Sequence, residues 1–289
     1  MTRTRREHVA RPDLDPLNIY QYPTHLRESI DQLPSTPGVY TFHGAEGDLP
    51  LYIGKSVNLR NRVLSHLRTV DEARMLRQTQ RISHIRTTGE IGALLLEASM
   101  IKQQQPLFNQ KLRRTKQMCA WRWQEGQPEI VYSKDVNFAC TPGLYGLYAS
   151  RHAALEHLRN IADTHRLCLG LLGLEKVKKG QACFRAMINR CGGACRGDED
   201  TLTHQQRLLT AFEEQKIFCW PYPSSIGLIE RLEGEIQIHV INHWCYLGTV
   251  SQVSAFHTLD RQAPGFDADG YKILCKPILG GTAEIILPG

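Results

Sequence analysis

Two short strand-like runs near the start of the chain place the strongest constraint on its fold. Residues 39–42 (Val-Tyr-Thr-Phe) and 51–54 (Leu-Tyr-Ile-Gly) are rich in apolar, β-branched and aromatic residues, and a loop rich in Gly and Asp joins them. This spacing predicts a β-hairpin. Because an isolated hairpin is at best marginally stable in water, these runs need helices or further strands around them.

The segments on either side of the hairpin complete a small α/β domain. Periodicity predicts helices at 24–33, 56–67, 71–79 and 90–104 and a strand at 81–87. Ser56 can cap the second of these helices, and Pro106 ends the last one. The order from the hairpin onward is β-β-α-α-β-α, so we expect a small mixed sheet flanked by helices.

The rest of the chain has weaker patterns, which favour a mixed α/β structure of the α+β kind. Strands are predicted at 120–133, 144–148, 236–241, 246–250 and 271–274, and helices at 151–165 and 199–216. At about 100–200 residues per domain, 289 residues suggest two or three units. We divide the chain into a polar basic tail (1–23), the α/β domain (24–116), a linking α/β region (117–166), a cysteine-rich segment (167–198) and a C-terminal α/β region (199–289).

The charge of the chain agrees with a polyanionic partner. It has 35 Lys and Arg against 29 Asp and Glu, which gives a formal net charge of +6. Many of the basic residues fall in or just after the α/β domain: Arg60, Arg62, Arg68, Lys111, Arg113, Arg114 and Lys116. Such clustering favours contact with phosphate.

The sequence shows no export or membrane signal. No run reaches the roughly 18 apolar residues of a membrane span, and no apolar core follows the N-terminal arginines. We therefore expect a cytoplasmic protein that does not enter a membrane, and we expect a monomer. Nine cysteines in such a chain would be reduced, which makes a disulfide framework the weaker explanation for them.

The α/β domain holds the residue types that phosphodiester hydrolysis needs. That reaction requires a group that activates water, positive charge on the phosphoryl oxygens and, in most enzymes, a divalent ion. If residues 55–66 are helical, Lys55, Arg62 and His66 lie within about 40° of one another and point away from the core. The alternative is an ordinary solvated helix face.

Glu97 and two tyrosines extend this set. On a helical wheel Glu97 lies beside Leu94 and Ile101, so its carboxylate is partly desolvated and needs a compensating cation. That cation could be a metal ion, or an arginine in a structural salt bridge. Tyr40 and Tyr52, on paired strands, could project their phenols to one side of the hairpin, although buried tyrosines are often core residues.

Five short motifs in this domain resemble, in order and spacing, those of the GIY-YIG nuclease family. They are Gly38-Val39-Tyr40, Tyr52-Ile53-Gly54-Lys55, Arg62, Leu96-Glu97-Ala98 and Phe108-Asn109. Each triplet alone is a weak signal, but the whole series over about seventy residues is specific. The resemblance is strongest to the UvrC-like excinucleases, and it extends through the cysteine-rich segment.

The resemblance implies roles for the acidic, basic and phenolic residues. Glu97 would be the single protein ligand of Mg²⁺ or Mn²⁺, and Arg62 would hold the scissile phosphate. Tyr52 or Tyr40 would help to deprotonate the attacking water. Since a phenol has a pKa of about 10, it needs positive charge nearby, which Lys55 could supply.

Two further positions complete the implied site. UvrC-type sequences often carry tyrosine where this chain has His66, whereas some restriction enzymes of the family carry histidine. His66 would then be the general base or would activate a tyrosine, and its alternative is an exposed helix histidine. Asn109 would position the site through hydrogen bonds, and its alternative is a loop cap after Pro106.

Four cysteines form a second candidate site. Cys168, Cys183, Cys191 and Cys195 are separated by fourteen, seven and three residues, with a Gly-Gly turn between the last two. Four thiolates suit a tetrahedral metal ion or a cubane cluster, and the alternative is a set of buried cysteines without a ligand. The resemblance implies a [4Fe-4S] cluster, with Zn²⁺ as the alternative.

Other candidate ligands are weaker. We interpret the remaining cysteines as core or chance residues: Cys119, Cys140, Cys219, Cys245 and Cys275. Asp267 and Asp269 lie on either side of Ala268 and could bind a metal ion, but a turn is the simpler explanation.

The residues and the resemblance together predict an endonuclease of nucleotide excision repair. It would make one incision, on the 3′ side of a bulky lesion in double-stranded DNA marked by UvrB, and residues from about 199 onward would dock the partner. One alternative is a homing or restriction-type enzyme that reads its own DNA sequence, although no C₂H₂ finger or clear helix-turn-helix is present. Another is an inactive DNA-binding scaffold.

Overall fold

The computed structural model describes residues 24–45, 49–112, 117–177, 181–263 and 265–287. The expected tail (1–23) and Arg113, Arg114 and Lys116 of the basic cluster lie outside these residues. The chain forms two compact units, the first from Met1–Arg114 with Glu230–Gln237 and the second from Thr115–Ile229 with Ile238–Gly289. Within the described ranges, no helix combines the length and apolarity needed to cross a membrane.

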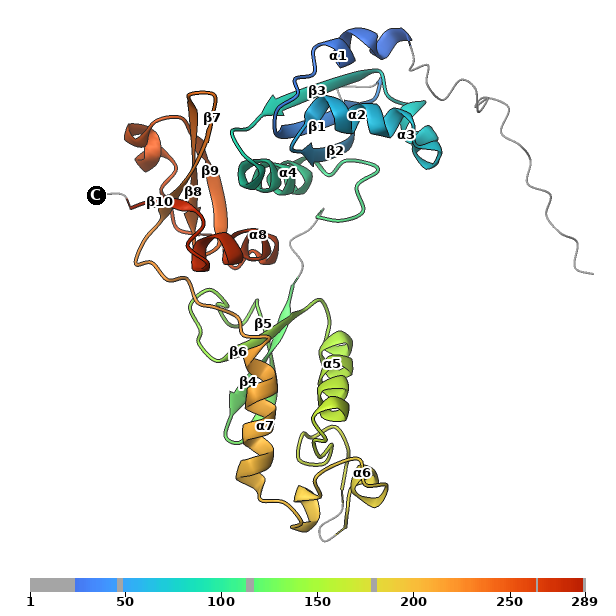
Figure 1. Ribbon diagram of the computed structural model, residues 1–289, viewed down its shortest axis with the longest axis vertical. Helices are drawn as coiled ribbons and strands as arrows, with labels where there is room; N and C mark the ends of the chain where they lie inside the picture. Colours follow the sequence, from blue (N-terminus) through green and yellow to red (C-terminus); the bar gives the residue numbers. More distant parts are fainter. Residues whose placement is uncertain (1–23, 46–48, 113–116, 178–180, 264, 288–289) are drawn as a thin grey trace, which may run out of the picture. The chain divides into compact units, whose positions relative to one another are not determined.

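The first unit contains a three-stranded sheet in the order β2-β1-β3. Its strands are β1 (Gly38–His43), β2 (Pro50–Ser56) and β3 (Arg81–Arg86), so the predicted hairpin and third strand are confirmed (Figure 1). The expectation of a mixed sheet is wrong, because both strand pairs are antiparallel. β3 runs in the same direction as β2 but on the other side of β1, so each neighbour opposes the central strand.

Helices cover both faces of this sheet. They are α1 (Arg27–Asp31), α2 (Leu59–Leu67), α3 (Ala73–Leu76) and α4 (Glu90–Gln104), with 3-10 turns η2 (Thr24–Leu26) and η3 (Val70–Glu72). Tyr40 and Phe42 pack in one buried cluster with Val63 of α2, whereas Val39 packs with Ile101 of α4. This alternation along β1 is what a strand covered on both sides requires.

Helix α2 starts later than the sequence suggests. The expected cap, Ser56, instead ends β2, and Asn58 caps the helix by accepting a 2.9 Å hydrogen bond from the backbone N–H of Asn61. Lys55 therefore lies on a strand and not on a helix with Arg62. The prediction that Lys55, Arg62 and His66 share one helix face is therefore wrong for Lys55, because two residues separate the end of β2 from the start of α2.

A hairpin tip from the C-terminal part of the chain caps α4 in the same unit. Gly89, which precedes this helix, has no side chain to cap it, and the carboxylate of Glu230 accepts hydrogen bonds from Ile91 N (3.0 Å) and Gly92 N (2.7 Å). A Cβ at Gly89 would overlap that carboxylate. The negative charge also lies at the positive end of the helix, which stabilises it further.

The second unit contains the linking region and the cysteine-rich segment. Strands β4 (Cys119–Gln124), β5 (Gln127–Tyr132) and β6 (Leu144–Tyr148) pair antiparallel in the order β5-β4-β6. Helices α5 (Arg151–Thr164), which Ser150 caps, and α7 (Thr201–Glu213) share a buried core with this sheet. The short α6 (Phe184–Met187) and η4 (Ala194–Arg196) lie between them in sequence.

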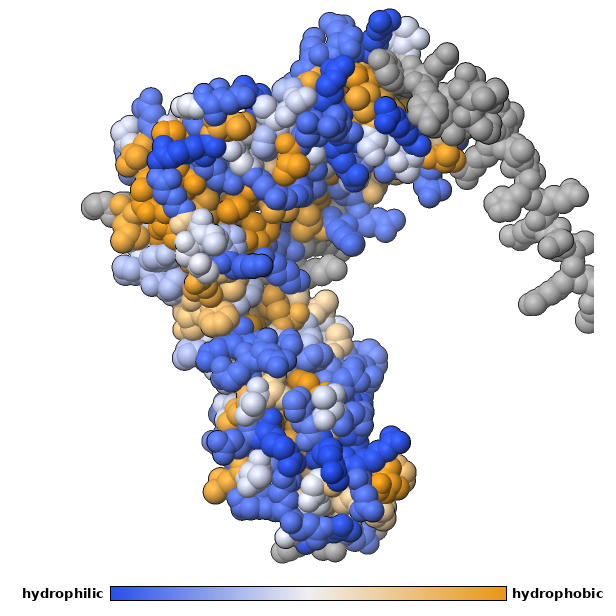
Figure 2. Space-filling model, viewed as in Figure 1, coloured by the Kyte–Doolittle hydropathy of each residue, from blue (hydrophilic) through white to orange (hydrophobic). Residues whose placement is uncertain are grey.

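Helix α6 is unusual for its exposed apolar surface. Figure 2 shows hydrophobic side chains gathered over it, and the exposed residues there are Phe184, Met187 and Ile188. The side chains of α6 are therefore divided, with Ala186 buried toward the cysteines and the larger ones facing outward.

The C-terminal residues form a four-stranded sheet in the order β10-β7-β8-β9. It consists of β7 (Ile226–Leu232), β8 (Glu235–Asn242), β9 (Cys245–Val250) and β10 (Glu284–Ile286). The 3-10 helix η5 (Val253–Thr258) and helix α8 (Ala268–Leu279) lie between β9 and β10 in the sequence. The predicted strand at 271–274 is wrong, since these residues lie in α8. Asp267 caps that helix by accepting from Asp269 N at 3.1 Å, so the two aspartates belong to a helix start.

The cap on α4 leads to a stability prediction. Replacing Glu230 by Ala should lower the free energy of unfolding of the first unit by about 1 kcal/mol, because two helix N–H groups lose their acceptor. Hydrogen exchange followed by mass spectrometry should show faster exchange at Ile91 and Gly92.

Glu233 provides the matched control on the same hairpin. Its carboxylate pairs with Arg86 at 3.7 Å, but the pair is exposed, so Glu233→Ala should change stability by less than about 0.5 kcal/mol. Equal exchange rates at Ile91 in the Glu230→Ala protein and the unmodified protein would contradict the cap.

Candidate active site

The candidate site lies along β2, an edge strand whose outward backbone groups are closed by other segments. Phe108 N donates to Leu51 O at 2.7 Å. The side-chain amide of Asn109 then bonds both backbone groups of Ile53, accepting from its N–H and donating to its carbonyl, each at 2.9 Å. Asn109 is buried, so its amide acts as a short substitute for a fourth strand.

Glu97 accepts a hydrogen bond from the next backbone N–H along the same edge of β2. Its Oε1 accepts from Lys55 N at 3.1 Å, which directs the carboxylate of α4 toward the end of β2. Desolvation raises the pKa of Glu97, and the Lys55 N–H together with the charges of Lys55 and Arg62 opposes this rise. The partly desolvated carboxylate expected from the helical wheel is therefore present.

An aromatic cluster lies on the face of the hairpin that α2 covers. Tyr40 and Tyr52 have ring centroids 6.2 Å apart, and the ring of His66 lies 5.3 Å from the first and 5.5 Å from the second. Tyr40 and His66 are almost completely buried, whereas Tyr52 is half-buried. The phenol of Tyr52 is therefore the one that solvent can reach.

Gly54 makes room for this cluster. It is the residue opposite Tyr40 in the strand register, and a Cβ at this position would overlap the Tyr40 hydroxyl. The close approach of a phenol to the backbone explains why a residue without a side chain is needed here.

His66 connects the phenols to an acidic residue that the motifs did not indicate. Its Nε2 lies 2.5 Å from the Tyr40 hydroxyl, and its Nδ1 bonds Glu72 Oε2. The expected alternative of an exposed histidine is wrong, because His66 is 2% exposed. Sequence analysis missed Glu72 because it lies in a short 3-10 turn outside every motif. A carboxylate six residues after a candidate histidine was the available signal.

The two basic residues have different environments. Arg62 is exposed, and its guanidinium is the cation whose charge and hydrogen bond act on Tyr40. The ammonium of Lys55 is 2.5 Å from Glu90 Oε1, so it is already paired. The positive charge beside the phenols thus comes from Arg62 and not from Lys55.

The phenols and the histidine are all shifted toward their neutral forms. Desolvation raises the pKa of Tyr40 and of Tyr52, and the charge of Glu97 adds to the rise in Tyr52. Desolvation also lowers the pKa of His66, against the hydrogen bond and charge of Glu72. A water proton taken up here therefore has to move along a chain of neutral groups, because none of the phenols is ionised in advance.

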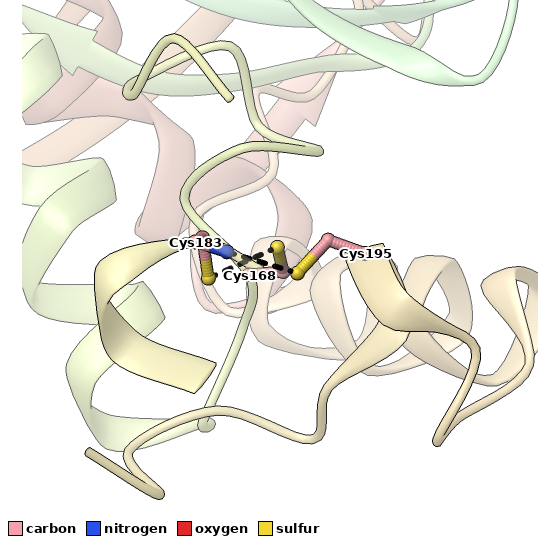
Figure 3. Close-up of side chains that lie close together, drawn as sticks. All are labelled: Cys168, Cys183 and Cys195. Atoms are coloured by element: carbon pink, nitrogen blue, oxygen red, sulfur yellow. Dashed lines mark hydrogen bonds between the residues drawn. The ribbon is translucent and has the colours of Figure 1, made fainter. Parts of the chain in front are cut away.

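The four predicted cysteines come together in the second unit, and Figure 3 shows three of them, Cys168, Cys183 and Cys195. Cys183 Sγ lies 3.6 Å from Cys168 Sγ and 3.7 Å from Cys191 Sγ, and Cys183 N donates to Cys195 Sγ at 3.3 Å. The sulfurs of Cys168, Cys183 and Cys195 all lie within 4.8 Å of one another. Apolar residues pack around them, and His204 Nε2 accepts a hydrogen bond from Cys168 N at 2.9 Å.

The spacing of these thiols suits a metal ion, whereas their ionisation differs, because desolvation raises the pKa of Cys191 as it does that of Cys168. Four thiolates around one tetrahedral zinc ion at about 2.3 Å would lie about 3.8 Å apart, close to the two measured separations, whereas a four-iron cluster would need wider spacing. Desolvation raises the pKa of Cys168 and acts in the same direction on Cys183. Hydrogen bonds from Ala186 N and the neighbouring thiols outweigh it at Cys183 and lower the pKa there.

Three family models match the chain. Residues 36–110 match the UvrC-like GIY-YIG domain, 118–214 the middle domain of UvrC/Cho excinuclease, and 225–288 the C-terminal domain of excinuclease Cho. The expected resemblance is thereby confirmed.

Full-length relatives agree with these matches. Excinuclease Cho of Escherichia coli K12 is 52% identical over 281 residues, which cover 97% of this chain and 95% of that protein. Excinuclease Cho of Salmonella typhi is 52% identical over 282 residues, covering 98% and 96%. UvrABC system protein C of Moorella thermoacetica is 30% identical over 192 residues, covering 63% of this chain and 30% of that protein.

Among solved structures, one similar chain is the GIY-YIG N-terminal endonuclease domain of UvrC from Thermotoga maritima, bound to magnesium as its catalytic divalent cation. It is 35% identical, covers 30% of this chain and 98% of that chain, and has a TM-score of 0.28. Since the long sequence matches to excinuclease Cho span almost the whole chain, the protein belongs to the excinuclease Cho family of UvrC-like GIY-YIG endonucleases.

Proposed function

We propose that the chain makes a single incision on the 3′ side of a bulky lesion in double-stranded DNA that UvrB has marked. The observation that carries this proposal is the convergence of a desolvated carboxylate from α4, an exposed guanidinium from α2 and the neighbouring phenols of Tyr40 and Tyr52 around the β1–β2 hairpin. These groups supply metal binding, charge stabilisation and proton transfer, which are the three requirements of phosphodiester hydrolysis.

Glu97 is the proposed ligand of the catalytic Mg²⁺ or Mn²⁺. One carboxylate fits a hard cation that keeps several waters and takes a phosphate oxygen. Lys55 and Arg62 already offset the charge of Glu97 in the absence of a metal, so they hold the carboxylate ready without neutralising it by a direct ion pair. Arg62 is the proposed phosphate contact.

Tyr52 is the proposed contact to the attacking water, since it is the half-buried phenol. Tyr40 lies behind it, hydrogen-bonded to Tyr52 and to His66, and receives the proton. Asn109 positions β2 through its two bonds to Ile53. The role of Lys55 is to support Glu97 and Glu90, and not to lower the pKa of a phenol.

The C-terminal residues matching the excinuclease Cho domain are the proposed docking site for UvrB. Recruitment by a protein removes the need for base contacts, and the roles proposed for the nuclease residues are with the metal, the phosphate and the water proton. A homing or restriction-type enzyme would need such a reading module, and the match over 97% of the chain to excinuclease Cho favours the repair function.

Incision assays test the catalytic assignment. On an end-labelled duplex with one bulky lesion, Mg²⁺ and UvrB, the unmodified protein should cut once on the 3′ side. Glu97→Gln and Arg62→Ala should each reduce the single-turnover rate at least about a hundredfold, because the first removes the proposed metal ligand and the second removes a positive charge that stabilises the transition state.

Glu28→Gln is the control for the loss of a carboxylate, since Glu28 is exposed on α1 of the same unit, and its rate should be unchanged. A Glu97→Gln protein that cuts as fast as the unmodified one contradicts the metal site. Cutting at a fixed sequence without lesion or UvrB contradicts the repair function and supports the restriction-type alternative.

We also propose that Cys168, Cys183, Cys191 and Cys195 hold a [4Fe-4S] cluster, with Zn²⁺ as the alternative. Four thiolates without a carboxylate are the ligand set of either. The separations of Cys183 Sγ from Cys168 Sγ and from Cys191 Sγ match a single tetrahedral ion, although Cys191 is not among the three sulfurs that all lie within 4.8 Å of one another. A cluster requires the thiols to move apart.

Metal analysis of anaerobically purified protein distinguishes the two. We expect about four iron and four sulfide per chain, and loss of both in Cys183→Ser. Cys140→Ser, at an exposed cysteine, should retain them. Zinc without iron contradicts the cluster but supports the site, whereas the absence of both metals contradicts the site itself.

A further inference from the structure

Glu72 completes the hydrogen-bonded chain of the active site from outside the motif series. It ends the turn η3, and its carboxylate is bonded to His66 Nδ1 while Nε2 of the same ring faces the Tyr40 hydroxyl at 2.5 Å. Each ring nitrogen thus has its own partner. The imidazole cannot turn over without losing both bonds.

These partners determine which ring nitrogen carries the proton. A carboxylate can only accept, so Nδ1 has to be the protonated nitrogen of the neutral ring, and Nε2 is left to accept from Tyr40. The charged and titratable groups that act on His66 are Glu72 and Arg62, and the phenols of Tyr40 and Tyr52 pack against its ring. Because burial keeps the ring neutral, its acceptor nitrogen is available.

We propose that Glu72 is a positioning residue of the nuclease reaction, which holds His66 as the final acceptor of a proton relay from Tyr52 through Tyr40. The inference rests on the proposed role of these two tyrosines. Glu72 touches neither the DNA nor the metal in this scheme. It acts only through the orientation and charge state of His66.

Each proton in the relay has a donor and an acceptor. As the water oxygen forms its bond to phosphorus, a water proton passes to the Tyr52 oxygen, the Tyr52 proton to the Tyr40 oxygen, and the Tyr40 proton to His66 Nε2. The P–O bond to the departing strand end breaks, and the departing oxygen takes a proton from solvent. Glu72 stabilises the resulting imidazolium until it returns its proton to solvent.

The tautomer of His66 gives a test that does not depend on nuclease activity. Nitrogen NMR of histidine-labelled full-length protein, with His66→Gln used to identify the signal, should show the Nδ1–H tautomer in the unmodified protein. Glu72→Ala should give a mixture of both tautomers. An Nε2–H tautomer in the unmodified protein, or no change in Glu72→Ala, overturns the proposal.

Kinetics test the consequence for the reaction. With saturating UvrB-marked DNA, Glu72→Ala should lower the single-turnover rate at least about tenfold, a part of the ~10²–10⁴ that a positioned base supplies. The affinity for DNA should stay unchanged. Asp71→Asn, which removes an exposed charge from the neighbouring position of η3, should incise at the unmodified rate.

A double-mutant cycle separates positioning from general destabilisation. If Glu72 acts through His66, Glu72→Ala should have no further effect in the His66→Gln protein. Additive losses, or a loss confined to DNA affinity, overturn the proposal. Unmodified protein that has the expected tautomer but makes no incision supports the placement of Glu72 and contradicts the proposed function.

Discussion

The nuclease fold depends on how the open edge of β2 is closed. An unpaired strand edge exposes backbone donors and acceptors that must be satisfied, and here side chains satisfy them. Asn109 takes both groups of Ile53, and Glu97 takes the N–H of Lys55. The hydrogen bond from Lys55 N to Glu97 therefore both satisfies the edge of the sheet and orients the candidate metal ligand.

Burial of the phenols sets a second constraint. A tyrosine with a raised pKa is a poor general base near neutral pH. Its phenolate would be a strong base, but very little of it is present at that pH. A chain of neutral groups avoids this difficulty, since a proton can move along it without a charge appearing at any buried phenol. His66 suits the end of such a chain, because burial keeps it neutral while Glu72 can stabilise its charged form.

The sequence predicted the framework of the site better than its electrostatics. The bounds of α4 agree with the prediction because a long periodic pattern and Pro106 define them. The start of α2 differs from the prediction, because Ser56 and Asn58 are both good caps and the position where β2 ends determines which of them is used. Because the helix starts later than predicted, Lys55 lies on the strand β2 and not on the helix.

Other misses have similar physical causes. Residues 271–274 alternate like a strand but belong to α8, which continues through Pro277. Glu230 could not be found from motifs, because it acts on residues brought near it only by folding, and Glu72 lies six residues after His66 but outside every motif. Pairings of this kind depend on tertiary structure, which periodicity does not report.

The hairpin that includes Glu230 bears on how the C-terminal region relates to the nuclease. The C-terminal family match begins at residue 225, yet Glu230–Gln237 belong to the same compact unit as the candidate catalytic residues. The bonds from Glu230 hold the first turn of α4, and Thr88 N adds a bond to Gln237 at 3.1 Å. Since Glu97 lies seven residues after Glu90 on this helix, about 10 Å along its axis, the cap is close enough to affect the carboxylate through helix fraying. The C-terminal segment therefore contributes to the helix that presents the candidate metal ligand, besides its proposed role in docking.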